Sequence, residues 1–301
     1  MKVRIGFGLG TATGLNDHRF GPLVDALEDL GWDSLWVSER ISGAAPDPTV
    51  ALAYAAGRTT RIKFGMSVMV LPGRNPVIVA TQLASLDRLS GGRLLPAFGL
   101  GIANPHEQQA FGVAREDRAP WFNEALPLLR RFWSEPSVDH DGKRFHYSGM
   151  RVEPKPHQQP MDIWLGGIAP SELKRVGRLA DGWLPSFITP DEAADARVVV
   201  ETAATEAGRI VDPEHFGALI PYTLGELPTA TRDALAARRP GVDPTTIVAT
   251  SYDSLRDKIG RFSSFGFSKF VVIPIAETGD IVAHLEEAAP ELLPLQASLS
   301  S

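Results

Sequence analysis

Short, almost continuously apolar runs alternate along the chain with longer stretches in which apolar residues recur every three or four positions. The short runs are typical of parallel β-strands that are covered on both faces. The longer stretches predict amphipathic helices, for example from Phe20 to Leu30, where Gly31 ends the pattern. Further helices of this kind are expected around residues 79–86, 122–132 and 255–262. Eight strands are predicted, at residues 3–9, 34–38, 62–71, 94–101, 162–166, 182–187, 217–224 and 269–273.

About eight strand–helix units fit into the 301 residues, which favours a (β/α)8 barrel, an α/β fold, with one domain spanning residues 1–301. Periodicity alone leaves a doubly wound parallel sheet open. Residues 137–147 predict a hairpin around an Asp-Gly turn, and with the Pro-rich residues 153–160 they form an insertion before the fifth strand. Residues 226–250 predict a second insertion, with one helix, between the seventh and eighth strands.

Composition narrows the classes of protein to which the chain can belong. Hydrophobic residues make up 44% of the chain, and the absence of cysteine excludes disulfides, thiol catalysis and cysteine-based metal centres. A net charge of −6 argues against nucleic-acid binding. There is no apolar run of about 18 residues, and the first residues do not resemble a signal peptide. We therefore expect a cytoplasmic enzyme or binding protein that acts on a small molecule and contacts neither membrane nor nucleic acid.

Three patterns resemble known functional motifs without matching them. Residues 139–141 (Asp-His-Asp) and His146 form a cluster, but the turn of an exposed hairpin explains it, and we predict no metal site. The sequence has no Gly-x-Ser-x-Gly motif that would support a serine hydrolase. Residues 8–14 have the spacing Gly-x-Gly-x-x-x-Gly, one residue longer than the dinucleotide-binding fingerprint. We predict a loop at a barrel mouth there.

Polar residues and glycines gather at the carboxyl ends of the predicted strands, which carry the active site in βα barrels. Glycine permits close approach of the backbone to a flat ring or a phosphate. Gly166 and Gly167, followed by a helix start at Pro170, predict an anion site because backbone N–H groups and the helix dipole point there. Ordinary βα turns are the alternative for any one position. The strand ends carry Gly8, Ser38, Glu39, Arg40, Ser67, Val68, Gly99, Gly101, Asn104, Gly166, Gly167, Ser186 and Tyr222.

A block between residues 65 and 93 is the most specific motif of the chain; it begins GMSVMVLPGRNP and ends ATQLASLDRLSGGR. Shorter motifs accompany it: GWDSLWV at 31–37, AFGV at 110–113, WLGG at 164–167 and ADGW at 180–183. Together they resemble the bacterial-luciferase-like flavin and deazaflavin oxidoreductases, the luciferase-like monooxygenase superfamily. The resemblance is closer to the branch that uses coenzyme F420, an 8-hydroxy-5-deazaflavin, than to the FMN-dependent monooxygenases.

The resemblance implies a (β/α)8 barrel with the tricyclic cofactor ring at its mouth and one face of the ring exposed for hydride transfer. It implies a non-prolyl cis peptide bond at the end of the third strand, between Ser67 and Val68. It also implies a homodimer. To the cofactor contacts we add Gly8, which ends the first strand. The contacts that the resemblance assigns are Ser67, Val68, Gly99, Gly101, Asn104, Gly166, Gly167 and Ser186.

The residues after the second strand depart from the family pattern. Many members have Asp-His there, and the histidine accepts a proton in the sugar-phosphate-oxidising enzymes; this chain has Glu39 and Arg40. Ala103 and Asn104 stand where those enzymes place a catalytic glutamate, and Thr189 lies near the position of a phosphate-binding lysine. Sugar-phosphate dehydrogenation is therefore not expected. We predict that Glu39 accepts or relays a proton and that Arg40 holds an anionic group. An ion pair between the two at the rim is the alternative.

The predicted function is hydride transfer between C5 of coenzyme F420 and an unidentified small organic substrate. Replacing Glu39 by Gln is expected to lower turnover and to leave cofactor affinity nearly unchanged. Two alternatives stay open. With reduced FMN, the same fold gives a two-component monooxygenase that needs a separate reductase. Without the Asp-His pair, the barrel can instead bind a deazaflavin without turnover. The apolar mouth and the insertion around residues 136–160 suggest a hydrophobic or conjugated substrate.

Overall fold

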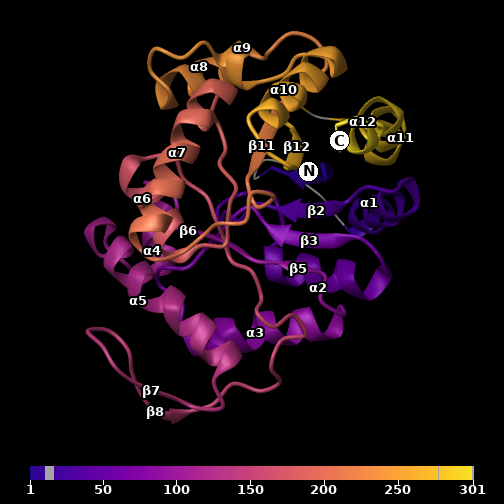
Figure 1. Ribbon diagram of the computed structural model, residues 1–301. Coiled ribbons are helices and arrows are strands. Elements are labelled where there is room, and N and C mark those ends of the chain that lie inside the picture. Colours follow the sequence, from indigo (N-terminus) through magenta and orange to yellow (C-terminus); the bar gives the residue numbers. More distant parts are fainter. Residues whose placement is uncertain (11–16, 277, 300–301) are drawn as a thin grey trace.

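The computed structural model describes residues 1–10, 17–276 and 278–299, and its parallel strands form the centre of the molecule, with helices around them (Figure 1). Most of the observed strands are shorter than the predicted apolar runs because only part of each run is paired, whereas β12 is one residue longer than predicted. The barrel strands are β1 (Arg4–Leu9), β2 (Ser34–Val37), β3 (Lys63–Met66), β4 (Met69–Val70), β5 (Leu94–Leu95), β6 (Ala97–Gly99), β9 (Trp164–Leu165), β10 (Gly182–Trp183), β11 (Gly217–Tyr222) and β12 (Lys269–Pro274).

The strand order shows that the sheet closes on itself. One sheet has the order β11-β12-β1-β2-β3-β5 and the other β10-β9-β6-β4, and the pairs within both are parallel. β3 and β4 belong to the third barrel strand, and β5 and β6 to the fourth, so these segments join the two sheets. Bridges from Trp183 to Phe216 and from Ser186 to Leu219 connect β10 to β11. The predicted (β/α)8 barrel is therefore confirmed, and the doubly wound sheet is excluded.

Two of the predicted strands are interrupted. The third, predicted as residues 62–71, is split into β3 and β4 at a cis peptide bond between Ser67 and Val68, where the resemblance placed it. The fourth, predicted as residues 94–101, is split into β5 and β6 at Pro96, which has no N–H to donate to the ladder. Neither break is visible in the apolar pattern, because the residues around both breaks are apolar or small.

Several helices begin with a capping side chain followed by proline. In α3, Asn75 precedes Pro76, and its Oδ1 accepts a hydrogen bond from the N–H of Val77. Proline suits this position because its missing N–H would have no partner there. The same start occurs in α2, α4, α7 and α9. The helices are α1 (Asp17–Leu30), α2 (Pro48–Arg58), α3 (Pro76–Leu89), α4 (Pro105–Phe111), α5 (Arg115–Ser134), α6 (Pro170–Leu179), α7 (Pro190–Glu206), α8 (Thr229–Arg238), α9 (Pro244–Ile247), α10 (Tyr252–Ser264), α11 (Ile281–Leu292) and α12 (Leu295–Ser298).

Both predicted insertions are present. β7 (Val138–Asp141) and β8 (His146–Met150) form an antiparallel hairpin before β9, which projects from the barrel at the lower left of Figure 1. The hairpin histidines have separate partners: His140 Nε2 lies 3.2 Å from Glu124 Oε1, and His146 Nδ1 lies 2.7 Å from Asp141 Oδ1. The second insertion, between β11 and β12, holds the two helices α8 and α9. The expectation of one helix was wrong, because a second cap-and-proline start follows α8.

The lumen of the barrel is filled at its amino end. Trp36 and Trp164 belong to a buried cluster inside the ring of strands, separate from the core between strands and helices. Glycine provides the room for these rings: a Cβ on Gly182 would lie 2.5 Å from Cδ2 of Trp164. Below the rings, Lys269 Nζ lies 3.0 Å from Asp33 Oδ2. Open space for a ligand is therefore left at the carboxyl ends of the strands.

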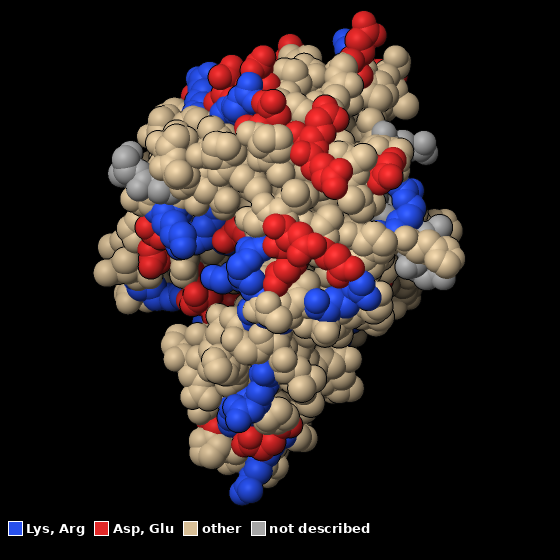
Figure 2. Space-filling model, turned by 90° about the vertical axis from the view of Figure 1, so that its right-hand side faces the viewer, with Lys and Arg blue, Asp and Glu red and all other residues tan. Residues whose placement is uncertain are grey.

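Charged side chains of both signs lie on the outside of the barrel. Figure 2 shows one face, on which acidic and basic groups are interspersed with uncharged surface. Exposed pairs such as Arg58 Nη2–Asp25 Oδ2, at 2.5 Å, contribute little to stability. Among the described residues, no helix has the length and apolar character that crossing a membrane requires.

Candidate active site

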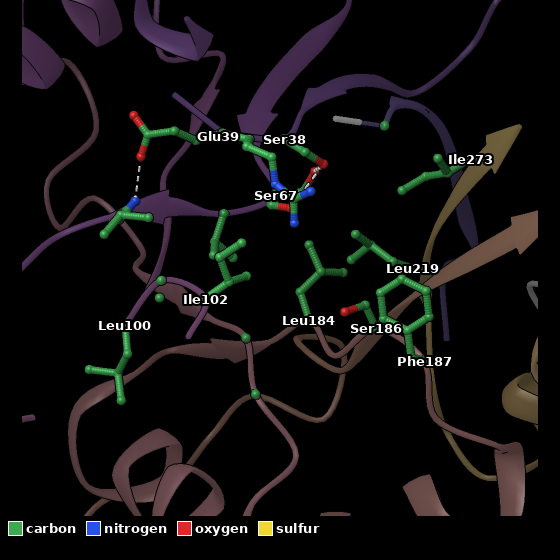
Figure 3. A pocket seen from close by; sticks show the side chains of 18 of the residues that line it. Ser38, Glu39, Ser67, Leu100, Ile102, Leu184, Ser186, Phe187, Leu219 and Ile273 are labelled. Atoms are coloured by element: carbon green, nitrogen blue, oxygen red, sulfur yellow. Dashed lines mark hydrogen bonds between the residues drawn. The ribbon is translucent and has the colours of Figure 1, made fainter. Parts of the chain in front are cut away.

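A cavity of about 950 Å³ opens at the carboxyl ends of the barrel strands. Its floor is the top of the apolar lumen, formed by Val68, Leu184, Leu219 and Ile273 (Figure 3). Ligand cavities of this size, largely apolar with a few polar groups, are typical of small-molecule and cofactor sites. The cavity therefore lies where the barrel fold places its active site.

Most of the residues predicted for the site meet in this cavity, but two of them do not. Gly8 lies inside the barrel wall, where a Cβ would be 2.5 Å from Cγ1 of Ile273, so its lack of a side chain makes room for β12. Asn104 caps α4 and accepts a hydrogen bond from the N–H of His106 at 2.9 Å. Residues 11–14 of the predicted mouth loop lie outside the described residues. The predicted residues that line the cavity are Glu39, Arg40, Ser67, Val68, Gly99, Gly101, Gly166, Gly167 and Ser186.

The side chain of Val68 occupies the space that two of the predicted glycines leave. A Cβ on Gly99 would lie 2.5 Å from Val68 Cγ2, and a Cβ on Gly166 would lie 3.3 Å from Val68 Cγ1. These glycines were predicted to admit a ring or a phosphate directly. In the structure they admit Val68, which then forms part of the cavity floor.

Two serine hydroxyl groups face each other above this floor. Ser38 Oγ lies 3.2 Å from Ser67 Oγ and 3.2 Å from the Ser67 carbonyl oxygen. Figure 3 shows this pair, and it shows Glu39 pointing away from it, toward the backbone of β4. Consecutive residues of an extended segment point to opposite sides, so Ser38 and Glu39 have different partners. Ser38 is thus a cavity residue for which its position at a strand end was the only sequence signal.

Glu39 does not form the predicted alternative ion pair with Arg40. Its carboxylate pairs instead with Arg74 and accepts a hydrogen bond from the N–H of Val70 at 2.6 Å. The Glu39 side chain is 2% exposed, and this burial raises the pKa of the carboxyl group although Arg74 acts in the opposite direction. Both oxygens of Glu39 are therefore engaged in fixing β4.

The anion site predicted at Gly166 and Gly167 is already filled by a carboxylate of the chain. Glu172 accepts hydrogen bonds from the N–H groups of Ile168 and Ala169, both at 3.0 Å, at the start of α6. These are donors that a bound anion would need. The prediction was wrong about these donors, because Glu172 at the third position of α6 takes them, as the glutamate of a capping box does.

Arginine is the prevailing charged residue of the cavity. Its described wall contains five arginines and three glutamates, although the chain as a whole has a net charge of −6. The glutamates are all engaged: Glu107, for example, accepts hydrogen bonds from the N–H groups of Ile41 and Ser42, both at 3.1 Å. Burial alone would raise the pKa of Glu107, but these bonds and the charge of Arg40 lower it. The cavity is therefore suited to an anionic ligand.

Two of these arginines are buried, and no sequence pattern pointed to either of them. Arg118 donates a hydrogen bond to the carbonyl oxygen of Ile102 at 2.7 Å, which fixes the loop after β6. Arg175 donates from Nε to Asn123 Oδ1 at 2.9 Å, and its guanidinium lies over the ring of Phe122. Burial lowers the pKa of Arg175. Both lie on predominantly amphipathic helices, at positions that pattern alone would assign to the core.

Fold and site together define a (β/α)8 barrel with a positively charged small-molecule cavity at its mouth. Residues 4–263 match the sequence profile of the luciferase-like monooxygenase family, and the chain belongs to this family. The membership that the motifs predicted is therefore confirmed.

One of the curated relatives names its cofactor. The chain is 30% identical over 167 residues to an F420-dependent glucose-6-phosphate dehydrogenase of Kineococcus radiotolerans, a match covering 52% of the chain and 49% of that relative. The chain spans about half the length of the curated relatives it matches.

Two solved structures share the fold of this chain. The coenzyme F420-dependent tetrahydromethanopterin reductase of Methanopyrus kandleri superposes with a TM-score of 0.78 at 20% identity, covering 98% of the chain and 99% of that structure. The oxygenating constituent of 3,6-diketocamphane monooxygenase of Pseudomonas putida, in complex with FMN, gives 0.75 at 19% identity, with 98% and 99% covered.

Proposed function

We propose that this protein is an F420-dependent oxidoreductase that transfers a hydride between C5 of the deazaflavin and a small organic substrate. The observation that carries the proposal is the cavity, in which an apolar floor lies within an arginine-rich wall. Coenzyme F420 combines a flat tricyclic ring with a phosphate and a carboxylate tail, so its two parts match the floor and the wall. The F420-dependent relative in Kineococcus supports this choice of cofactor.

The residues present fit this group. Val68, Leu184 and Leu219 offer the apolar surface on which a ring can lie. The guanidinium of Arg175 borders the cavity and is available to a phosphate on its free N–H groups. When bound, a deazaflavin supplies a carbon centre that gives or accepts a hydride.

The chain's own contribution is to position the reactants and to exclude water. The described lining of the cavity contains no histidine, lysine, tyrosine or aspartate, and its glutamates are held by backbone N–H groups. The hydroxyl groups of Ser38, Ser67 and Ser186 line the cavity and can donate a hydrogen bond to a substrate oxygen. We assign Glu39 the part of a positioning residue, which acts through Arg74 and the backbone of β4, and Arg40 a contact to an anionic group.

Glu39→Gln distinguishes this role from the predicted proton relay. A relay would remove one limb of the pH profile of kcat when its carboxyl group is replaced. A positioning residue would change kcat and KM together and leave the profile's shape intact. Loss of a limb in Glu39→Gln, with F420 affinity unchanged, would restore the relay.

The alternative cofactor is FMN, and the FMN complex of the Pseudomonas putida protein with the same fold favours it. The arginine-rich wall suits the FMN phosphate as well. The protein would then be a two-component monooxygenase. A carrier of deazaflavin without turnover is the third possibility, which the engaged state of all three cavity glutamates favours.

A fluorescence titration of the purified protein with F420 and, separately, with FMN tests the proposal. Tight binding of F420 alone is the expected result, followed by reduction or oxidation of bound F420 on addition of carbonyl or enone compounds. Preference for FMN together with oxygen consumption on addition of a reductase would overturn it. F420 binding without turnover of any compound would indicate the carrier. The homodimer, the cytoplasmic location and the single domain stay predictions.

A further inference from the structure

Arg40 and Arg238 reach the cavity from segments far apart in the sequence. Arg40 follows β2, and Arg238 ends α8 in the insertion between β11 and β12. Within the described residues, neither guanidinium makes a hydrogen bond or an ion pair. The other arginines of the wall all have such partners, such as the Gly279 carbonyl oxygen for Arg19. Arg40 and Arg238 are therefore the arginines of the cavity whose N–H donors are all free within the described residues.

Arg238 is held in place by its contact with Phe187. Its guanidinium carbon lies 4.3 Å from the centroid of the Phe187 ring, and the neighbouring Arg239 donates hydrogen bonds to the Phe187 carbonyl oxygen and to Glu192. Phe187 has a φ of 58°, which among the described residues no other non-glycine residue shares. A left-handed conformation is unfavourable for such a residue, so the surrounding contacts must hold it. Arg238 and Arg239, both in contact with Phe187, thus form one edge of the cavity.

The positive charges along this edge of the cavity favour binding of an anion. Desolvation, and then the positive charges of Arg40 and Arg239, lower the pKa of Arg238. Arg238 interacts electrostatically with Glu172, and Arg40 with Glu107, but both carboxylates are bound to backbone N–H groups. Arg40 is half-buried and Arg238 is exposed, so this edge of the cavity is open to solvent. An anion between the arginines would relieve their repulsion and receive several hydrogen bonds from them.

We propose that Arg40 and Arg238 form an anion subsite, in addition to Arg175, that takes the carboxylate or phosphate group of a ligand whose flat apolar body lies against Phe187. The assignment of this ligand as the substrate rests on the proposed function, and it deepens that function to anionic, planar, apolar substrates. The same chemistry is offered by the phosphate and carboxylate tail of F420 itself. The experiment below separates the two sources.

Calorimetric titrations with cinnamate and with cinnamamide test the subsite. The two probes share a flat apolar body and differ in charge. Wild type is expected to bind cinnamate at least ten times more tightly than cinnamamide. Arg40→Gln and Arg238→Gln should each reduce this preference at least five-fold, and Arg238→Lys should retain part of it. Arg232→Gln is the matched control, because it removes the same charge from an exposed position of the same helix, outside the cavity wall.

A wild type without preference for cinnamate, or a preference unchanged in both Gln variants, would overturn the subsite. Circular dichroism identifies any variant that fails to fold, and the Lys variant and Arg40→Gln then carry the test.

Two further titrations compare F420 with its chromophore that lacks the phosphate and tail. If Arg238→Gln weakens only F420, and bound F420 abolishes the cinnamate preference, the subsite holds the cofactor tail. If Arg238→Gln binds F420 and the chromophore as tightly as wild type does, the subsite holds the substrate. Failure of F420 to bind, with the cinnamate preference intact, would refute the proposed function and leave the subsite standing.

Discussion

At the amino end of the barrel, Lys269 and Asp33 form a buried ion pair beneath the buried rings of Trp36 and Trp164. At the carboxyl end, the wall of a cavity of about 950 Å³ holds arginines in excess over glutamates, and two of these arginines have no described partner. The same ring of strands thus ends in a neutralised, filled layer on one side and in an open, positively charged one on the other. The two ends therefore have different roles. Charge that is paired within the chain stabilises the fold, whereas unpaired charge at a cavity is available to a ligand.

Removing the charge at the filled end is expected to have the largest effect. Lys269→Met leaves Asp33 buried without its partner, and we expect the free energy of unfolding to fall by about 4 kcal/mol. The Lys269 side chain is 4% exposed, so water cannot replace it. Thermal unfolding measures the change. The control is Lys174→Met on the exposed face of α6, with a change within about 0.5 kcal/mol. Equal melting temperatures for both variants would remove the distinction between the two ends.

The pair of Glu39 and Arg74 tests whether part of the carboxyl end is also stabilising. Arg74→Met leaves a carboxylate that is 2% exposed with only the Val70 N–H, and we expect a loss of about 3 kcal/mol. Glu39→Gln leaves an arginine whose side chain is 24% exposed and can reach water, so we expect about 1 kcal/mol. Denaturant unfolding of both variants gives the order. The reverse order would show that Arg74 is the more buried partner in solution.

The floor of the cavity gives a prediction about affinity. Gly99→Ala would place a Cβ 2.5 Å from Val68 Cγ2 and must displace this side chain, whereas Gly166→Ala would place one at 3.3 Å. We expect Gly99→Ala to raise the Kd of F420 about ten-fold, equivalent to about 1.4 kcal/mol, and Gly166→Ala to have a smaller effect. Fluorescence titration measures both. Adding Val68→Ala to Gly99→Ala should recover part of the affinity if displacement of Val68 is the cause; no recovery would refute that cause.

The smallest effect concerns Glu107, which holds the loop after Arg40. Because its pKa is lowered in the folded protein, its stabilising contribution is present above the unfolded value of about 4.5 and is lost as the pH falls through the folded pKa. Glu107→Gln should therefore lower stability by about 1 kcal/mol at pH 7, and the difference from wild type should shrink toward pH 3. Melting curves across this range provide the measurement. A difference that is constant with pH would show that the charge of Glu107 has no part in it.

Much of the fold followed from the sequence because it depends on short-range patterns. Eight apolar runs, the hairpin at an Asp-Gly turn and the two insertions were predicted correctly, since strand and turn preferences act over a few residues. The breaks at Ser67–Val68 and at Pro96 were not visible in the apolar pattern; the first came from the family resemblance alone. The second helix of the later insertion was missed although its start at Asp243 and Pro244 resembles four others.

The barrel, the family and the strand ends at which a site must lie could be predicted from the sequence, because these follow from periodicity and from motifs that are contiguous along the chain. Which charged side chains lack a partner within the chain could be seen only in the folded structure. It paired Glu39 with Arg74 instead of Arg40, folded Glu172 back onto the start of α6, and brought Arg238 to the same cavity as Arg40. The physical reason is that an ion pair depends on distance in space and on burial, and neither can be inferred from the separation of two residues along the chain.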